Sequence, residues 1–298
     1  MSQAGRLTAA DFDQRLLNLF DDYIHGRMTR ERFLNRATPF IRKGQNSEQA
    51  LAALQPDYLS SVRVPPDDPA IRSETVVYDS PRGHGPIRAL VAWPAYGTRP
   101  RPGILVIHEN RGLNPYIADV ARRLAKAGFL AMAPDGLSPL GGYPGDDEKG
   151  REMQATLDPD KLSNDFLAAL PFLRAHDRCN RRVAAVGFCY GGAICNAMAV
   201  HCPDLNAAVA FYGRQPRPED VPGIRATLLL HYAELDEKVN AGWPAYEAAL
   251  KKNGKAFAAH VYPGANHGFH NDSTPRYDAV AATMAWGRTL AFLGDQLA

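Results

Sequence analysis

An apolar run that leads into two closely spaced glycines places the tightest constraint on the fold of this chain. Val183-Ala184-Ala185-Val186 is followed by Gly187-Phe188-Cys189-Tyr190-Gly191, and a helix-forming segment comes next. Small residues two positions before and two positions after a nucleophile allow a sharp turn from strand to helix, which exposes the central side chain at the edge of a sheet. The pattern predicts a nucleophile elbow carrying Cys189, and a buried structural cysteine is the alternative interpretation.

Strand-like and helix-like segments alternate along residues 71–298, which favours an α/β fold. Strands are expected at 73–78, 87–93, 103–108, 129–133, 183–187, 207–211, 228–232 and 256–262. The first two are joined by a turn-like segment and are expected to form an antiparallel hairpin. Helices are expected at 115–127, 161–175, 192–200, 244–252 and 277–293. The rhythm predicts a mainly parallel, doubly wound sheet flanked by helices.

Residues 1–70 are interpreted as an N-terminal helical extension and linker, because most of this segment is polar and helix-forming and lacks any strand-like run. A catalytic domain is expected over 71–298. Thr8 to Asp11 reads as a capping box. After it, apolar residues fall on one helical face: Phe12, Leu16, Leu19, Phe20, Tyr23 and Ile24. Shorter helices are expected at 30–37 and 47–54, and a proline-rich cluster at 65–69 marks the junction. The apolar face around Leu16 and Phe20 is expected to pack on the catalytic domain or on a second subunit, as in a homodimer.

The charge balance excludes a charged-polymer partner. With 34 basic and 32 acidic residues, the net charge of +2 is too small for a nucleic-acid footprint or a polybasic membrane surface. The sequence contains no run of 18 apolar residues and no apolar core of a secretory signal near its start. We therefore expect no membrane association and a cytoplasmic location.

The four cysteines do not form a metal-binding or disulfide pattern. They lie at positions 179, 189, 195 and 202, and no C-x-x-C pair occurs among them. A disulfide framework and a zinc site are both unexpected. The chain is accordingly interpreted as needing no metal and no cofactor.

An acid and a histidine follow Cys189 in the order typical of α/β-hydrolases, which is nucleophile, acid, histidine. Asp236 comes after the predicted strand at 228–232, and His267 comes after the predicted strand at 256–262. Both fall in loops beyond the carboxyl ends of strands, where active-site loops of open α/β sheets gather. His267 is therefore expected to reach both Cys189 and Asp236. Local rivals for the acid and base roles are Glu234, Glu237 and His270.

The turn after the strand at 103–108 adds a carboxylate and a backbone donor. It reads His108-Glu109-Asn110-Arg111-Gly112, which places Glu109 at the mouth of the same sheet. An oxyanion hole in this type of fold uses the N–H after the nucleophile, here Tyr190, and one from this earlier loop, here Asn110. Glu109 would gate the ionisation of Cys189, or else pair with a neighbouring arginine, Arg111 or Arg123.

These motifs resemble the dienelactone hydrolase family, also called carboxymethylenebutenolidase, over residues 71–298. Besides the two motifs at 108–112 and 187–192, the resemblance is carried by Pro134-Asp135-Gly136-Leu137, Phe211-Tyr212-Gly213, Leu235-Asp236 and Asn266-His267-Gly268-Phe269. It implies an α/β-hydrolase fold and a triad of Cys189, Asp236 and His267. It also implies that Glu109 holds the resting thiol and takes its proton when substrate binds.

The resemblance implies less about substrate recognition. Two arginines clamp a substrate carboxylate in the best-known members; Arg151 matches the first, whereas Asn271 stands at the second position and carries no charge. Arg111 or Arg276 would take the place of the second arginine. The alternative interpretation is that each is a solvated surface arginine. Tyr143, in the long segment before the helix at 161–175, is a further candidate contact. A branch of the family carries a leader with adjacent arginines, which the segment at 29–34 lacks, so export is not expected.

The sequence therefore predicts a cofactor-free hydrolase that cleaves a small lactone or activated ester through Cys189 and an acyl-enzyme. A broader thiol esterase or thioesterase acting on small neutral acyl compounds is the alternative suggested by Asn271. A third interpretation, from another class, is a non-catalytic protein in which Cys189 is a reversible oxidation site, with Cys195 and Cys202 nearby.

Overall fold

The computed structural model describes residues 6–298 and is organised around one eight-stranded sheet with the order β1-β2-β4-β3-β5-β6-β7-β8. Only β1–β2 and β2–β4 pair antiparallel, and all other neighbours are parallel. The strands are β1 (Ile71–Ser80), β2 (Gly85–Pro94), β3 (Arg101–Ile107), β4 (Leu130–Pro134), β5 (Cys179–Phe188), β6 (Ala207–Phe211), β7 (Thr227–Ala233) and β8 (Phe257–Tyr262). The predicted parallel sheet and its antiparallel hairpin are confirmed.

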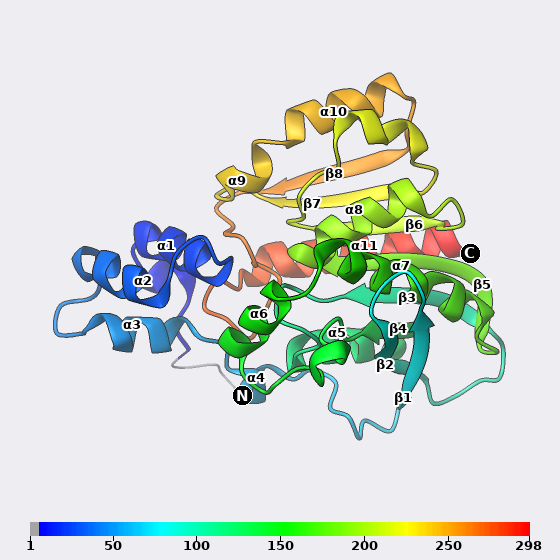
Figure 1. Ribbon diagram of the computed structural model, residues 1–298, viewed down its shortest axis with the longest axis horizontal. Helices are drawn as coiled ribbons and strands as arrows, with labels where there is room; N and C mark the ends of the chain where they lie inside the picture. The colour runs from blue at the N-terminus through cyan, green and yellow to red at the C-terminus, as the bar shows by residue number, and fades with distance from the viewer. Residues whose placement is uncertain (1–5) are drawn as a thin grey trace.

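The central strands are apolar on both faces because helices cover both sides of the sheet (Figure 1). Along β5, Val183 and Ala185 face one core, whereas Ala184 and Val186 face the other, as the two-residue period of a strand requires. The first core is shared with α7 (Pro159–Ala175), α8 (Tyr190–His201) and α10 (Trp243–Lys252). The second is shared with α5 (Pro115–Lys126) and α11 (Ala279–Leu297). This is the predicted doubly wound architecture.

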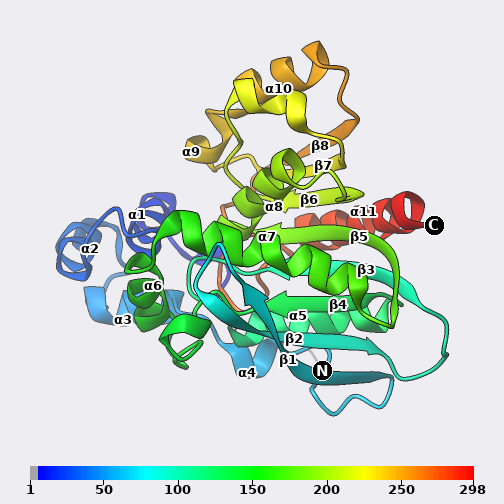
Figure 2. The same ribbon diagram turned by 45° about the vertical axis from the view of Figure 1, so that its right-hand side comes forward.

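The N-terminal helices pack into a small core of their own. They are α1 (Gln14–Ile24), α2 (Arg30–Ala37) and α3 (Ser47–Leu54), and α4 (Tyr58–Ser61) follows them. Leu16, Phe20, Phe33 and Leu54 are fully buried in a cluster made of residues from this segment alone. The apolar face around Leu16 and Phe20 is therefore covered mainly by the neighbouring helices of its own segment, and not by the catalytic domain as the sequence predicts. In Figures 1 and 2 this group lies beside one end of the sheet.

The start of α1 differs from the sequence-based expectation. The Thr8–Asp11 capping box is present, but it encloses a short 3-10 helix, Ala9–Asp11, and leaves Phe12 outside α1. The side chain of Asp13 accepts a hydrogen bond from Arg15 N and caps α1 instead. An aspartate next to the helix satisfies one of the free N–H groups of the first turn, so the helix begins there.

Three short helices, α4, α6 (Asp147–Ala155) and α9 (Glu237–Asn240), lie in segments for which the sequence predicts no secondary structure. Of these, α6 lies in the long segment after β4 and is capped by Asp146. The helix α9 begins directly after Asp236. Within residues 6–298, none of the helices combines the length and the apolar character needed to cross a bilayer.

Candidate active site

Cys189 lies at the tip of a sharp turn between β5 and α8. Its backbone has φ 56°, in the left-handed region that non-glycine residues rarely adopt. A Cβ atom at Gly187 would overlap the carbonyl of Gly191, and a Cβ atom at Gly191 would overlap the carbonyl oxygen of Ile107. The two glycines are therefore required by close backbone packing, and the backbone forms the predicted elbow.

His267 and Asp236 come from neighbouring loops at the same edge of the sheet. The Nδ1 atom of His267 lies 2.5 Å from Oδ2 of Asp236, and both side chains are more than nine-tenths buried. The two loops follow the parallel strands β7 and β8, and the N–H of Leu235 donates to the carbonyl of Ala265 at 3.0 Å. Asp236 also caps α9 through Val239 N. The acid and the histidine are thus fixed by the sheet register and by the start of a helix.

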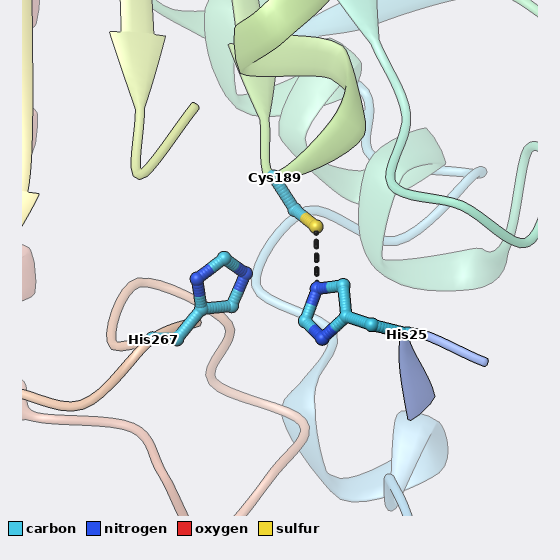
Figure 3. Close-up of side chains that lie close together, drawn as sticks. All are labelled: His25, Cys189 and His267. Carbon is cyan, nitrogen blue, oxygen red and sulfur yellow. Dashed lines mark hydrogen bonds between the residues drawn. The ribbon is translucent and has the colours of Figure 1, made fainter. Parts of the chain in front are cut away.

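A second histidine, which the sequence did not single out, contacts the sulfur. The Nε2 atom of His25 lies 3.1 Å from Sγ of Cys189 (Figure 3). One ring nitrogen of each histidine and the sulfur lie within 4.8 Å of one another, and the two rings meet edge to face at 4.7 Å between centroids. The only signal in the sequence is the four-residue spacing of Asp21 and His25 at the end of an amphipathic helix.

The charges around Cys189 favour its thiolate. Burial opposes ionisation, but His25 and His267 outweigh it and lower the pKa of the Cys189 thiol to about 6. Burial alone would lower the pKa of His267. Asp236 and the Cys189 sulfur outweigh burial and raise this pKa well above the ordinary value. The site therefore favours a thiolate beside protonated imidazole at neutral pH.

The other three thiols lie in purely structural surroundings. Cys179, Cys195 and Cys202 belong to the core under α7 and α8. Burial raises the pKa of Cys179 and Cys195, and burial with the nearby Asp204 raises the pKa of Cys202 to about 11. Only Cys189, among the four, has the electropositive surroundings of a reactive thiol.

A cavity of about 420 Å³ opens in front of Cys189. The backbone N–H of Tyr190, the first residue of α8, has no acceptor within its own helix, as is usual for a first turn. Asn110 also lines the cavity, and its side chain donates to the carbonyl of Ile24 at 2.8 Å. Tyr212, with φ 40°, and Arg214 complete the wall next to α8. Both residues predicted for the oxyanion hole thus line the cavity that contains Cys189.

The carboxylate of Glu109 contacts Asn271 and Arg111 and makes no hydrogen bond to the sulfur of Cys189 among the described residues. Its Oε2 accepts a hydrogen bond from Asn271 at 3.3 Å and lies 3.8 Å from the Nε atom of Arg111. Within the described part of the chain, the sulfur of Cys189 is hydrogen-bonded to His25, not to Glu109. The role implied for Glu109 stays a prediction, and this conformation does not contain the contact that it requires.

The arginines and the tyrosine that the sequence suggests as substrate contacts interact with other residues of the protein. Asp147 accepts hydrogen bonds from Arg111 at 2.9 Å and from Tyr143 at 2.8 Å. Arg151 lies over the ring of Tyr23 in the N-terminal segment, with its guanidinium carbon 5.4 Å from the ring centroid. None of these arginines or tyrosines belongs to the cavity lining around Cys189.

The remaining alternatives lie outside the constellation. Glu234 accepts from the N–H of Gly264, and Glu237 is exposed in α9. His270 is bonded to Tyr116, and burial lowers its pKa, which keeps its ring neutral. Arg276 approaches Asp21 at 3.5 Å, and Arg123 pairs with Asp119 and Asp272. Of the acids and histidines considered from the sequence, Asp236 and His267 are the two that line the cavity.

This arrangement, an elbow cysteine beside a histidine–aspartate pair on a doubly wound sheet, defines an α/β-hydrolase. The chain belongs to the dienelactone hydrolase family, whose model matches residues 87–297. It is thus a hydrolase acting on ester or lactone bonds, which confirms the predicted enzyme class and sets aside the non-catalytic interpretation. A second model, described as YqhI-like, matches residues 3–42.

Individual relatives agree with the family model. A protein of Saccharolobus solfataricus named as a carboxymethylenebutenolidase is 30% identical, with 73% of this chain and 96% of that protein covered. The hydrolase fragment YghX of Escherichia coli K12 is 55% identical over 106 residues, which are 36% of this chain and 91% of the fragment. A dienelactone hydrolase structure from Klebsiella pneumoniae superposes with a TM-score of 0.65 at 25% identity, covering 75% of this chain and 99% of that one.

Proposed function

We propose that this chain hydrolyses small lactones or activated esters by nucleophilic catalysis at Cys189. The observation that carries the proposal is the meeting of an elbow cysteine with a histidine–aspartate pair at one cavity. A thiolate is the nucleophilic form of cysteine, and the lowered pKa of Cys189 makes it available at neutral pH.

Each side chain has a defined step. The thiolate of Cys189 attacks the carbonyl carbon, and the N–H groups of Tyr190 and Asn110 bind the oxygen as it becomes negative. As the acyl-enzyme forms, protonated His267 gives its proton to the leaving oxygen. The neutral ring then removes a proton from water, which attacks the acyl carbon and releases the sulfur. Asp236 holds His267 by Nδ1, so that Nε2 points to the reacting atoms.

The nucleophile restricts the leaving group. In the tetrahedral intermediate a thiolate leaves more readily than an alkoxide, so attack on simple alkyl esters tends to reverse. An enolate or dienolate is a better leaving group, because its charge is delocalised. Strained or conjugated lactones and enol esters are therefore the substrates that suit Cys189 best.

A second candidate, hydrolysis of small neutral acyl compounds, is favoured by the engagement of the candidate arginines. Arg111 is paired with Asp147, and Arg151 packs on Tyr23.

Among the described residues, three arginine or lysine side chains line the cavity. Arg27 and Lys238 are paired with Asp21 or Asp22. Arg214 is exposed and is therefore the one best placed to meet a substrate carboxylate. Rates on a charged and a neutral lactone of equal size, compared in wild type and Arg214→Gln, separate the two candidates.

The decisive test of the proposal is the Cys189→Ala variant. Removing a nucleophile that acts together with its base typically costs orders of magnitude, so we expect kcat on a dienelactone or p-nitrophenyl acetate to fall roughly 10⁴-fold or more. Cys195→Ala, which removes a buried structural thiol, is the matched control. Equal rates for Cys189→Ala and wild type would refute the proposal.

A further inference from the structure

His25 is built into the site by the N-terminal segment. It follows the last residue of α1, and its Nδ1 atom lies 2.7 Å from the carbonyl oxygen of Asp21 and 3.2 Å from the carboxylate of the same residue. Both of these groups only accept hydrogen bonds, so Nδ1 carries a proton. In the neutral ring Nε2 is then an acceptor, and it faces the sulfur of Cys189 at 3.1 Å.

Polar contacts at both ends of α1 fix this helix against the loops at the edge of the sheet. The carbonyl of Ile24 accepts from Asn110, and Gln14 donates to Asn266, the residue before His267. Asp22 pairs with Lys238 at the start of α9, and Asp21 approaches Arg276. His25 is thus held in place by the loop after β3, the loop after β8 and α9.

The two histidines have separate partners. His267 is bonded through Nδ1 to Asp236, and its buried Nε2 is without a hydrogen-bond partner among the described residues. The hydrogen bond to the sulfur is made by His25 (Figure 3). One imidazole is therefore placed to take the thiol proton, while the other is free to face the leaving group and water.

We propose that His25 is a catalytic residue that ionises Cys189 in the resting enzyme. The S–H bond of Cys189 breaks, and the proton moves to Nε2 of His25, which leaves a thiolate and an imidazolium as an ion pair; no electrons are exchanged. The inference rests on the proposed function of Cys189. His25 lies outside the residues that the dienelactone hydrolase model matches, so the role is not one carried over from that family.

The charges facing His25 support this proton position. Burial alone would lower the pKa of His25, but Cys189 and Asp21 raise it to about 9. The other charged or titratable groups around the ring are His267, the cavity residues Arg27, Arg214, Asp236 and Lys238, and Arg276 behind Asp21. Arg27 is paired with Asp21 and Asp22, and Lys238 with Asp22, which weakens their effect on the ring.

The test is the pH dependence of Cys189 alkylation by iodoacetamide, with Cys189→Ala as the blank. Wild type is expected to react with a midpoint near the thiol pKa of about 6. In His25→Gln the midpoint moves toward the ordinary thiol value of ~8.5, so that alkylation at neutral pH slows about tenfold or more. Its kcat/KM at neutral pH falls in parallel, and the difference from wild type narrows at alkaline pH. His201→Gln, at the exposed end of α8, is the matched control.

A second variant separates chemistry from folding. In His25→Ala, added imidazole is expected to restore alkylation at neutral pH, since the cavity in front of the sulfur admits it. An unchanged midpoint in His25→Gln, with Cys189→Ala inactive, would overturn this inference and leave the proposed function intact. An active Cys189→Ala variant would refute both this inference and the proposed function. Inactivation by EDTA with recovery on zinc chloride would also overturn it, because the two histidines and Cys189 would then be metal ligands.

Discussion

The sheet and the N-terminal helices each bring a histidine to Cys189, but they hold it in different ways. His267 lies in the loop after β8, and its acid lies in the loop after the adjacent parallel strand β7. His25 directly follows α1, whose apolar residues pack within the N-terminal cluster, and polar contacts hold this helix against the loops at the edge of the sheet. The first histidine is positioned by strand register, and the second by the docking of a separate small core.

This difference explains what each region can contribute. Strand register fixes the loops beyond β5, β7 and β8 at one edge, so the histidine–aspartate pair stays with the fold. A segment that has its own core and a polar interface is less tightly coupled to the sheet, because partly exposed ion pairs contribute little. In the proposed mechanism, proton transfer to His25 therefore depends on docking, whereas proton transfer by His267 does not.

The largest expected effect is on kcat, and its pH dependence distinguishes the roles of the two histidines. General acid–base catalysis contributes about 10²–10⁴-fold, so His267→Gln is expected to lower kcat by about 10³-fold at every pH. The loss in His25→Gln narrows at alkaline pH, because hydroxide can ionise the thiol there. Full pH profiles of kcat/KM for both variants are the measurement. Profiles of the same shape for the two variants would mean that the histidines act as one unit.

The next effect tests whether the two regions open independently. Leu54 is fully buried in the N-terminal cluster, and Leu54→Ala is expected to destabilise that cluster by about 3 kcal/mol. Limited proteolysis should then cut the N-terminal helices faster without faster cutting in the sheet, and alkylation at neutral pH should slow. Leu59→Ala, at a leucine that is 95% exposed, is the control. Equal acceleration in both regions would show that they unfold together.

The smallest effect concerns a single docking contact. Lys238 pairs with Asp22 across the interface, but both side chains are partly exposed, so Lys238→Ala is expected to cost about 0.5 kcal/mol. Alkylation at neutral pH should slow by about twofold at low salt, and the difference should vanish near ~1 M salt, where such pairs are screened. Lys251→Ala removes a comparable pair with Glu247 on α10 and should change neither. A salt-independent loss would argue against an electrostatic hold.

Much of the fold could be predicted because its buried strands are apolar runs that can be recognised in the sequence. The runs around Val186, Val209 and Leu229 are apolar throughout, which is typical of strands buried on both faces. The helix α6 was missed because its apolar residues are few and its buried positions include Gly150 and Gln154. The box at Thr8 misplaced the start of α1, since the same local pattern also encloses a single 3-10 turn.

The site residues could be predicted only where they directly follow parallel strands, because the topology then brings them to the same edge of the sheet. Cys189, Asp236 and His267 follow three strands of one parallel sheet, so their meeting at one edge could be inferred from sequence. His25 follows no strand and carries no motif, and its place depends on how one helix docks on the sheet. The pairing of Arg111 with Asp147 could not be predicted for the same reason, because it joins the loop after β3 to the start of α6.

The hydrogen bond between His25 and Cys189 joins residues that are 164 positions apart. During synthesis the N-terminal helices leave the ribosome well before the elbow does, and contacts of such long separation form late in folding. Until they form, the thiol lacks one of the two positive neighbours that favour its thiolate. In a chain whose N-terminal helices have not yet docked, the Cys189 thiol therefore ionises less readily, so the acidity of this one thiol reports that docking is complete.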